Sequence, residues 1–430
     1  EMLRSLVGSE MCIRDRINPY TISKSRTGGI IARYIARTEL SFVAARMFGP
    51  SRELCESYAN LIRNSDQKNF EKNAMIADYV MKSYSPDPVT GRRKRVMMLL
   101  FEGENAVEKV WKVTGSAFLE WGSGGTIRDT YGDYITDEKG NVIYFEPAVL
   151  VAPNPTRAEA ALKLWASYSE QDGGIIESAV DVPFGDKIEK TLVLLKPDNF
   201  RYPSARAGYI IDHLSMANLR IVGIKKFRMT VSQAEKFYGP VQEVLKRKFL
   251  EGDGERRIEN LLKNEFGFNL IPATRRLICE EVAPFYARQQ LEEIIHFMTG
   301  YRPSECQQSE KDWLGKEECL ALIYEGIGAV QKIRDILGQT DPSKAKPGSV
   351  RREFGSNIMI NAAHASDSLE SALREIEIVD VAKDTIKTFV EKHYGLAKIR
   401  KSKFSKALYT NKIIKYVREK WKTLITSIKV

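Results

Sequence analysis

The chain repeats itself at long range, and this repeat constrains its fold more than any other feature. Residues 17–48 align with residues 195–227, which read INPYTISKSRTGGIIARYIARTELSFVAARMF and LKPDNFRYPSARAGYIIDHLSMANLRIVGIKKF. Each segment runs from an apolar stretch into x-Pro, through a polar loop, into a helix opened by a glycine (Gly29 or Gly208), and then into an apolar strand. The sequence therefore predicts two copies of one domain.

The two copies keep the same order further along the chain. MMLLFEGENAVEKVWKVTG matches CLALIYEGIGAVQKIRDILG, GGTIRDTYG matches PGSVRREFG, and VLVAPNPTRAEAALKLW matches AAHASDSLESALREIE. Each copy then reads as strand, helix, strand, helical segments, strand, helix, loop, strand, helix. This order predicts an α+β fold in which helices lie on one face of an antiparallel sheet.

The repeat divides a chain of 430 residues, about three times a typical domain, into two main domains and three connecting or terminal segments. The second copy carries a helical insert at about 241–283, and the first carries a hairpin-like insert, DYITDEKGNVIYFE, with a Gly-Asn turn. We expect a leader at 1–16 that resembles translated adaptor sequence, a first copy at 17–170, a linker at 171–188, a second copy at 189–380 and a basic helical tail at 381–430.

Cysteine usage and hydropathy predict a cytoplasmic protein without a membrane segment. The five cysteines are odd in number and unclustered, so they show neither a disulfide framework nor zinc-ligand spacing. No apolar run approaches the roughly 18 residues that a membrane span needs, and the first residues lack the apolar core of a signal peptide.

The net charge of +10 belongs to the tail. Residues 381–430 contain 14 lysines or arginines against three acids, whereas the rest of the chain is close to neutral. A basic tail can contact nucleic acid, but a solvated helical face explains the same composition, and we favour the solvated face.

His364 lies where a packed strand should pass into a helix, in the segment IMINAAHASDS. A structural histidine is the simpler interpretation of an imidazole among small residues. Ser366 and Asp367 follow it as natural helix N-caps, however, so the ring should face a helix N-terminus, where backbone N–H groups favour an anion. Imidazole can carry a phosphoryl group because it is partly neutral at physiological pH. The inward face of the helix consists of Leu369, Leu373 and Ile376.

The second copy resembles the nucleoside diphosphate kinase family. The resemblance rests on TLVLLKPD, on YEGIGAVQKIRDILGQTDPSKAKPGSVRREFG and on NAAHASDSLESALREIE, in that order and spacing. It implies a ferredoxin-like βαββαβ fold and phosphoryl transfer through His364. The sequence departs from the family at Ala365, Ile360 and Arg352 and in the helical insert. No GxxxxGK[ST] or GxGxxG segment occurs, so the sequence gives no support to a P-loop or a Rossmann fold.

The resemblance also implies the roles of the other site residues. Glu375 should hydrogen-bond the ring of His364 and fix its tautomer; without the resemblance it would be read as an exposed helix carboxylate. Lys196 should contact the transferred phosphate, and Mg²⁺ should arrive on the nucleotide rather than on a protein site. The full set comprises His364, Lys196, Tyr238, Glu375 and Ser366 for catalysis, and Lys196, Arg334, Thr340, Arg351, Asn361 and Phe285 for the nucleotide, with Tyr286 as the alternative to Phe285 for stacking on the base.

The first copy has lost this set. In the aligned register, Ala152, Asn18, Trp111, Val149 and Lys163 take the places of His364, Lys196, Arg334, Asn361 and Glu375, while Arg128 and Tyr58 persist. Such a copy cannot run the reaction, and it should serve packing or regulation.

These observations predict a nucleoside diphosphate kinase that works by a ping-pong path through phospho-His364. Two alternatives stay open: a non-catalytic regulatory protein that binds nucleotide or nucleic acid, and phosphotransfer from His364 to a protein. Residues 40–48 and 219–227 are apolar and β-prone in both copies, so we expect these strands to meet in an internal pseudo-dimer. A higher homo-oligomer stays open.

Overall fold

The computed structural model describes residues 11–65, 69–117, 124–139, 142–177 and 187–394. The described residues from Met11 to His393 form one compact unit. Most of the predicted leader, half of the predicted linker and residues 395–430 of the predicted tail lie outside the described residues.

Each predicted strand of the first copy is present, and β1 begins inside the segment assigned to the leader. The elements are β1 (Met11–Ile17), α1 (Pro19–Ser23), α2 (Thr27–Thr38), β2 (Ser41–Phe48), α3 (Arg52–Arg63), α4 (Phe70–Tyr84), β3 (Val96–Glu102), α5 (Ala106–Thr114), α6 (Ile127–Tyr131), β4 (Asp133–Thr136), β5 (Val142–Glu146), β6 (Val149–Leu150), α7 (Pro155–Ser167) and α8 (Ser169–Asp172).

The second copy has the same order with longer helices between its second and third strands. Its elements are β7 (Ile188–Leu195), η2 (Pro197–Asn199), α9 (Arg206–Leu214), η3 (Ser215–Ala217), β8 (Arg220–Phe227), α10 (Val231–Tyr238), α11 (Val241–Glu251), α12 (Gly254–Phe266), α13 (Pro272–Thr299), η4 (Pro303–Glu305), β9 (Cys319–Ile327), α14 (Ala329–Leu337), α15 (Val350–Phe354), β10 (Ala363–Ala365), α16 (Leu369–Val379) and α17 (Ile386–Tyr394).

The strands of both copies join in one eight-stranded sheet of order β10-β7-β9-β8-β2-β3-β1-β6. Within each copy the order is fourth, first, third, second, and every pairing is antiparallel. This is the ferredoxin-like βαββαβ arrangement, so the predicted fold class is confirmed. The hairpin β4–β5 forms a separate two-stranded sheet in the first copy.

Helices cover both faces of the sheet, so the expectation of helices on one face was wrong. Strand β9 is buried at every position from Cys319 to Gly326. An antiparallel strand with one face in water would alternate between buried and exposed residues. Alternate β9 residues belong to a core shared with α10, α13 and α16, while α14 packs against β7 and β9.

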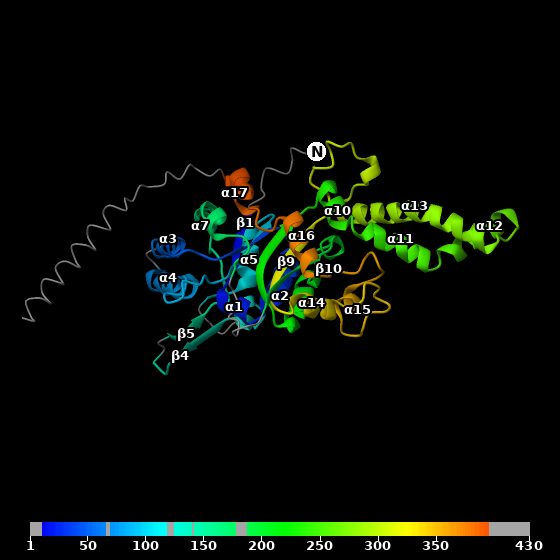
Figure 1. The fold of residues 1–430 in the computed structure, drawn as a ribbon. Coiled ribbons are helices and arrows are strands. Elements are labelled where there is room, and N and C mark those ends of the chain that lie inside the picture. The colour runs from blue at the N-terminus through cyan, green and yellow to red at the C-terminus, as the bar shows by residue number, and fades with distance from the viewer. Residues whose placement is uncertain (1–10, 66–68, 118–123, 140–141, 178–186, 395–430) are drawn as a thin grey trace, which may run out of the picture. The chain divides into compact units, whose positions relative to one another are not determined.

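The helical insert has a small core of its own. Helices α11 and α12 pack along α13, as Figure 1 shows in green to yellow, and their buried contact is made by Phe249, Ile258, Cys279 and Ala283. Among the described residues, no helix combines the length and hydropathy that a membrane crossing requires.

Strands β2 and β8 are neighbours in the sheet, which places the two expected edges side by side. Arg46 pairs with Lys225, and these two residues occupy equivalent positions in the aligned segments 40–48 and 219–227. Both side chains are buried. Lys225 Nζ donates to the carbonyls of Val379 and Asp380 at the end of α16, at 2.9 and 2.7 Å. Arg46 likewise donates to the Ser169 carbonyl, at 3.1–3.2 Å, so each buried cation stabilises carbonyl groups near the end of a helix.

Helices α2 and α9 cross at two glycines. A Cβ added to Gly208 would lie 2.4 Å from the Gly28 carbonyl oxygen, and one added to Gly28 would lie 2.4 Å from the Gly208 carbonyl oxygen. The counterpart of Gly208 is therefore Gly28. The sequence alignment had paired Gly208 with Gly29, whose added Cβ would instead meet Tyr131.

We expect Gly208→Ala to destabilise the full chain because the new methyl group would force the two helix backbones apart. Overpacking of this kind costs about 1–3 kcal/mol. Tyr209→Ala, on the exposed side of the same helix, is the matched control and should change the free energy of unfolding by less than about 0.5 kcal/mol. Equal denaturant midpoints for the two variants would contradict the close helix crossing.

The folded chain continues past residue 380, where the predicted tail begins. Val381, Ile386 and Val390 are buried. The Lys383 carbonyl accepts a hydrogen bond from Arg46 Nη1 at 3.0 Å, which ties this segment to the first copy. The first part of the segment assigned to the tail is therefore folded against the rest of the protein.

We expect deletion of residues 395–430 to leave the melting temperature of the protein close to that of the full chain. Deletion of residues 381–430 should lower the melting temperature, because it exposes the apolar surface that Val381, Ile386 and Val390 cover and removes an acceptor from buried Arg46. Thermal unfolding of both truncations checks this, and two equal melting temperatures would contradict it.

Candidate active site

Pairing of β10 with β7 brings the predicted site residues together. His364 lies opposite Leu194, and Ala363 lies opposite Leu195, the residue before Lys196. Ala362 adopts a left-handed conformation with φ of 71°. Its carbonyl accepts hydrogen bonds from the Lys196 backbone N–H at 3.0 Å and from Asn199 Nδ2 at 2.7 Å, so the turn before β10 is fixed to the end of β7.

Glu375 orients the ring of His364. Glu375 Oε2 lies 2.9 Å from His364 Nε2, and it also accepts a hydrogen bond from Ser366 Oγ at 2.7 Å. Because a carboxylate only accepts hydrogen bonds, this contact favours the tautomer of the neutral ring in which Nε2 carries the proton and Nδ1 the lone pair. The His364 side chain is 23% exposed and the Glu375 side chain 5%, so the ring is open to a ligand while its partner is buried.

Ser366 has a different role from the one predicted. The N-cap of α16 is Ser368, whose hydroxyl accepts from the Ser371 N–H at 3.0 Å. Ser366 is fully buried and donates to Glu375 instead. A second residue, Arg374, donates to Glu375 Oε1 at 3.4 Å and to the Lys236 carbonyl at 3.0 Å, which ties the carboxylate to α10.

Two aromatic rings pack beside the imidazole. The Tyr238 ring centroid lies 6.1 Å from that of His364, and the Phe237 centroid lies 5.0 Å away in an edge-to-face contact. The Tyr238 hydroxyl is buried and has no hydrogen-bond partner within the described part of the chain, and burial raises the pKa of Tyr238 well above its usual value. Phe237 was missed in the sequence; its position next to Tyr238 in α10 was the only signal.

Lys196 faces the loop that precedes β10. Its Nζ donates to Asn361 Oδ1 at 2.7 Å and to the Met359 carbonyl at 3.2 Å. Asn361 Nδ2 in turn donates to the Thr340 carbonyl at 3.0 Å, which connects three predicted residues. Burial, followed by the nearby charge of Arg351, lowers the pKa of Lys196 to about 8.

Arg351 holds the backbone of the site. Its guanidinium donates to the carbonyls of Gly338 and Ala363, at 2.8 and 3.0 Å. Arg128 makes the same pair of bonds in the first copy, to Gly115 and Val149 at 2.7 and 3.0 Å. Both copies use this arginine to fix the fourth strand, which explains why Arg128 persists where the chemistry is absent.

Arg334 lies exposed on α14 and contributes charge to the same region. Its proximity, after burial, lowers the pKa of Arg351 to about 10. The pKa of Asp367 is also lowered, first by its hydrogen bond with Ser371 and then by the charges of Arg334 and His364. The charge of Arg334 therefore acts on both Arg351 and Asp367.

The structure does not join the predicted stacking residues to this group. Phe285 is 68% exposed on α13. It lies 11 residues before His296 in the last turn of that helix, a separation of about 16 Å along the helix. Tyr286 stacks on Phe249 with ring centroids 4.4 Å apart in the core of the insert. No ring contact or hydrogen bond in the described structure connects either residue to His364 or Lys196, so stacking on the base stays a prediction.

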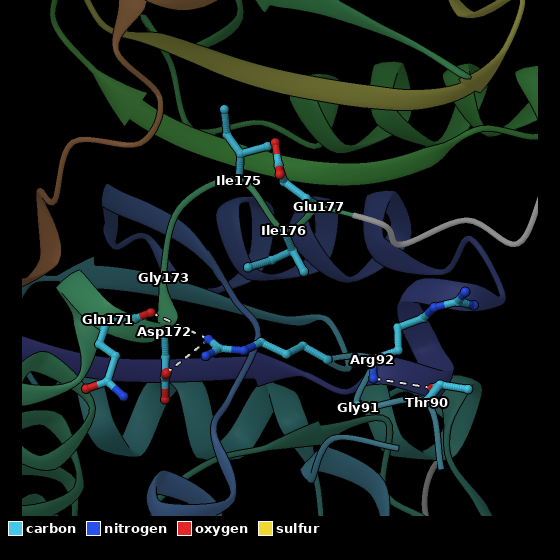
Figure 2. Close-up of a pocket in the computed structure, with 10 residues that line it drawn as sticks. Thr90, Gly91, Arg92, Gln171, Asp172, Gly173, Ile175, Ile176 and Glu177 are labelled. Carbon is cyan, nitrogen blue, oxygen red and sulfur yellow. Dashed lines mark hydrogen bonds and ion pairs between the residues drawn. The ribbon is translucent and has the colours of Figure 1, made fainter. Parts of the chain in front are cut away.

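A cavity of about 460 Å³ lies elsewhere, between the loop 90–93 and the segment that runs from the end of α8 to Glu177. Its charged side chains already have partners: Arg93 Nη1 lies 3.1 Å from Asp172 Oδ1, and Asp172, labelled in Figure 2, also accepts a hydrogen bond from Ser51 Oγ. Glu177 is bonded to Lys190 at 3.0 Å. A smaller cavity of about 270 Å³ adjoins the His364 site, because Met359 lines it.

Strand pairing corrects the register of the first copy. Leu150 lies opposite Arg16, as His364 lies opposite Leu194, so Leu150 occupies the histidine position that the alignment gave to Ala152.

Further equivalent positions follow from the backbone. Ala161 is seven residues after the N-cap Asn154, as Glu375 is after Ser368, so Ala161 replaces Glu375 where the alignment had Lys163. Ala148 and Ala362 share the left-handed turn, so Pro147 stands where Asn361 does, and the alignment with Val149 was wrong.

We expect anion affinity at the His364 site to fall as the pH rises through about 8. The lowered pKa means that Lys196 is charged below this value and neutral above it. Sulfate is a suitable probe because its own charge is constant from about pH 7.5 to 9.5. Calorimetric titration should show this loss in the full chain but not in Lys196→Arg, since a guanidinium stays charged. A constant affinity across this range would exclude Lys196 from the anion site.

Comparison with known proteins identifies a match to the nucleoside diphosphate kinase family model over residues 189–252 and 296–385. The interruption falls in α12 and most of α13. Nucleoside diphosphate kinase from Persephonella marina is 28% identical over 189 residues, with 44% of this chain and 91% of that protein covered. The protein of the same name from Campylobacter jejuni serotype O:2 is 29% identical over 190 residues, covering 44% and 93%.

Two solved structures also align with 45% of this chain. The nucleoside diphosphate kinase of Aquifex aeolicus is 26% identical with a TM-score of 0.28, and an NDP kinase from Pyrobaculum aerophilum is 24% identical with a TM-score of 0.31. The alignments cover 95% of each of those chains.

Proposed function

We propose, from the premise that residues 189–385 form a domain of the nucleoside diphosphate kinase family, that the chain transfers the γ-phosphate of a nucleoside triphosphate to a nucleoside diphosphate through phospho-His364. The observation that carries the proposal is the Ser366–Glu375–His364 array, which presents Nδ1 of a partly exposed ring. Lys196 lies at the end of the strand that pairs with β10.

The geometry supports the following first half-reaction. The Nδ1 lone pair attacks the γ-phosphorus, an N–P bond forms, and the bond to the β,γ-bridging oxygen breaks, so that the nucleoside diphosphate leaves with the electron pair. The ring becomes cationic, and Glu375 stabilises it through Nε2–H. Lys196 and Arg334 would neutralise charge on the equatorial oxygens. The second half-reaction reverses these steps with a different nucleoside diphosphate.

The nucleotide contacts are assigned as predicted from the sequence. Arg334, Arg351 and Thr340 bind the phosphates and nucleotide, Asn361 binds the sugar, and Phe285 is the proposed stacking residue. Mg²⁺ would supply charge neutralisation on the phosphates. The donor set fits an ion carried by the nucleotide, because it consists of cations and an amide, and the described residues contain no cluster of three or more possible metal ligands.

The division into a degenerate first copy, a linker and an active second copy remains part of the proposal, with the folded region extended from Met11 to α17. We also propose that the copies act as an internal pseudo-dimer, supported by the pairing of β2 with β8. Phosphotransfer to a protein differs from the main proposal only in its acceptor. A purely binding function would leave unexplained why the Glu375–His364 pair is kept in one copy and absent from the other.

We expect incubation with γ-labelled ATP to label the chain with acid-labile, alkali-stable phosphate, and a chase with GDP to remove the label as GTP. His364→Ala should abolish both steps, because no other group replaces the nucleophile, and should leave the fold intact. The phosphate should be found on Nδ1, since Nε2 is bonded to Glu375. Phosphorus NMR of the labelled protein distinguishes the two ring nitrogens.

His393→Ala, on α17, is the matched control and should exchange phosphate normally. Exchange that survives in His364→Ala would exclude the mechanism. Labelling of His364 without transfer to GDP would instead favour a protein acceptor.

A further inference from the structure

The first copy replaces an active-site loop with its hairpin. In the second copy, Arg351 donates to the Ala363 carbonyl, and these two residues are 12 apart in sequence. The loop between them supplies the Met359 carbonyl and the Asn361 side chain that accept hydrogen bonds from Lys196. The equivalent pair in the first copy, Arg128 and Val149, is 21 apart. This longer segment contains the hairpin of β4 and β5.

The last residue of the hairpin, Glu146, turns into the first copy and is 4% exposed. Its carboxylate accepts three hydrogen bonds. Asn18 Nδ2 donates at 3.1 Å, the Tyr79 hydroxyl at 2.7 Å and the Ala148 backbone N–H at 3.2 Å. Tyr84 completes the group by donating to Asn18 Oδ1 at 2.6 Å.

Asn18 stands in the place of Lys196. Each residue ends the first strand of its copy and precedes a proline, and each donates its backbone N–H to the left-handed alanine before the fourth strand, at 3.0 Å in both copies. The Glu146 carboxylate therefore contacts the side chain that replaces the phosphate-binding lysine.

We propose that the first copy is an anion site occupied by the chain itself: the Glu146 carboxylate takes the position of a phosphate, so the first copy accepts no nucleotide. The statement that the second copy does accept one rests on the proposed function above, whereas self-occupation of the first copy does not.

The chemistry of the cluster fits an internal anion. The three groups that hydrogen-bond the Glu146 carboxylate are all donors, a side-chain amide, a phenol and a backbone N–H, and they outweigh the weaker repulsion from Asp133. Burial raises the pKa of Glu146, and these three bonds oppose that effect. The buried Arg16 adds positive charge beside the cluster, because its proximity acts to lower the pKa of Tyr84 against the larger effect of burial.

Removal of the carboxylate tests the site without involving the second copy. Glu146→Ala should lower the melting temperature of the full chain, because Asn18, Tyr79 and the Ala148 N–H lose their acceptor. Sodium formate should recover part of this loss in Glu146→Ala, since a small carboxylate can bind the exposed donors. Neither the unsubstituted protein nor Leu150→Ala, an apolar cavity control in the same copy, should gain comparably from formate.

Formate that stabilises all three proteins equally, or none of them, would overturn self-occupation. If Glu146→Ala does not fold, the isosteric Glu146→Gln and the unsubstituted protein decide the question through crosslinking with 8-azido-ADP. All label should map to residues 187–394, and label in residues 11–177 of the unsubstituted protein would overturn the proposal. If the unsubstituted protein shows no phosphate exchange, the kinase function is rejected. Formate rescue of Glu146→Ala would still support self-occupation of the first copy.

Discussion

The pairing of β2 with β8 is the interaction on which the rest of the molecule depends. It converts two four-stranded sheets into one of eight strands and removes an exposed edge from each copy. The pairing places Arg46 and Lys225 in the interior, where an unpaired charge would be costly. Carbonyl groups at Ser169, Val379 and Asp380 accept hydrogen bonds from these two cations, so the strand pairing is linked to the start of α8 and to the end of α16.

Helix α16 connects this junction to the chemistry. Its C-terminal end is bonded to Lys225, and one helical face carries Glu375, which orients His364. At its N-terminal end, Ser368 caps the helix two residues after Ser366, which donates to the same carboxylate. The carboxylate that orients the imidazole thus lies on a helix whose C-terminal end is bonded to Lys225, the residue that pairs with Arg46 of the first copy.

The sequence was sufficient to predict the fold class and the residues that β7, β10 and α16 bring together. Alternating apolar residues and the x-Pro after the first strand mark equivalent elements in both copies, and the order of these elements determines the strand order. The hydrogen bond expected between Glu375 and His364 is present. Asn361 and Lys196 also meet, although no sequence spacing requires it, because β10 pairs with β7 in an antiparallel register.

The errors came from features that spacing does not encode. The hairpin in the first copy shifted the alignment by two residues, which concealed Leu150 and Ala161 as the replacements for His364 and Glu375. Ser366 and Ser368 are chemically equal N-cap candidates, and only the backbone decides between them. Phe285 was chosen by residue type, and its role stays a prediction because the described contacts of this exposed ring on α13 do not reach His364 or Lys196.

The opposition of Arg46 and Lys225 has a consequence for how such a chain can change. In an assembly of two identical subunits, a residue at this position would face a copy of itself, and any substitution would occur twice. Here β2 and β8 are encoded by different parts of one gene, so the buried cation is arginine in one strand and lysine in the other. The two strands nevertheless stay paired in a fixed one-to-one ratio. Because the two copies are covalently linked, their contacting strands need not be identical. One copy can therefore lack the imidazole while the other keeps it.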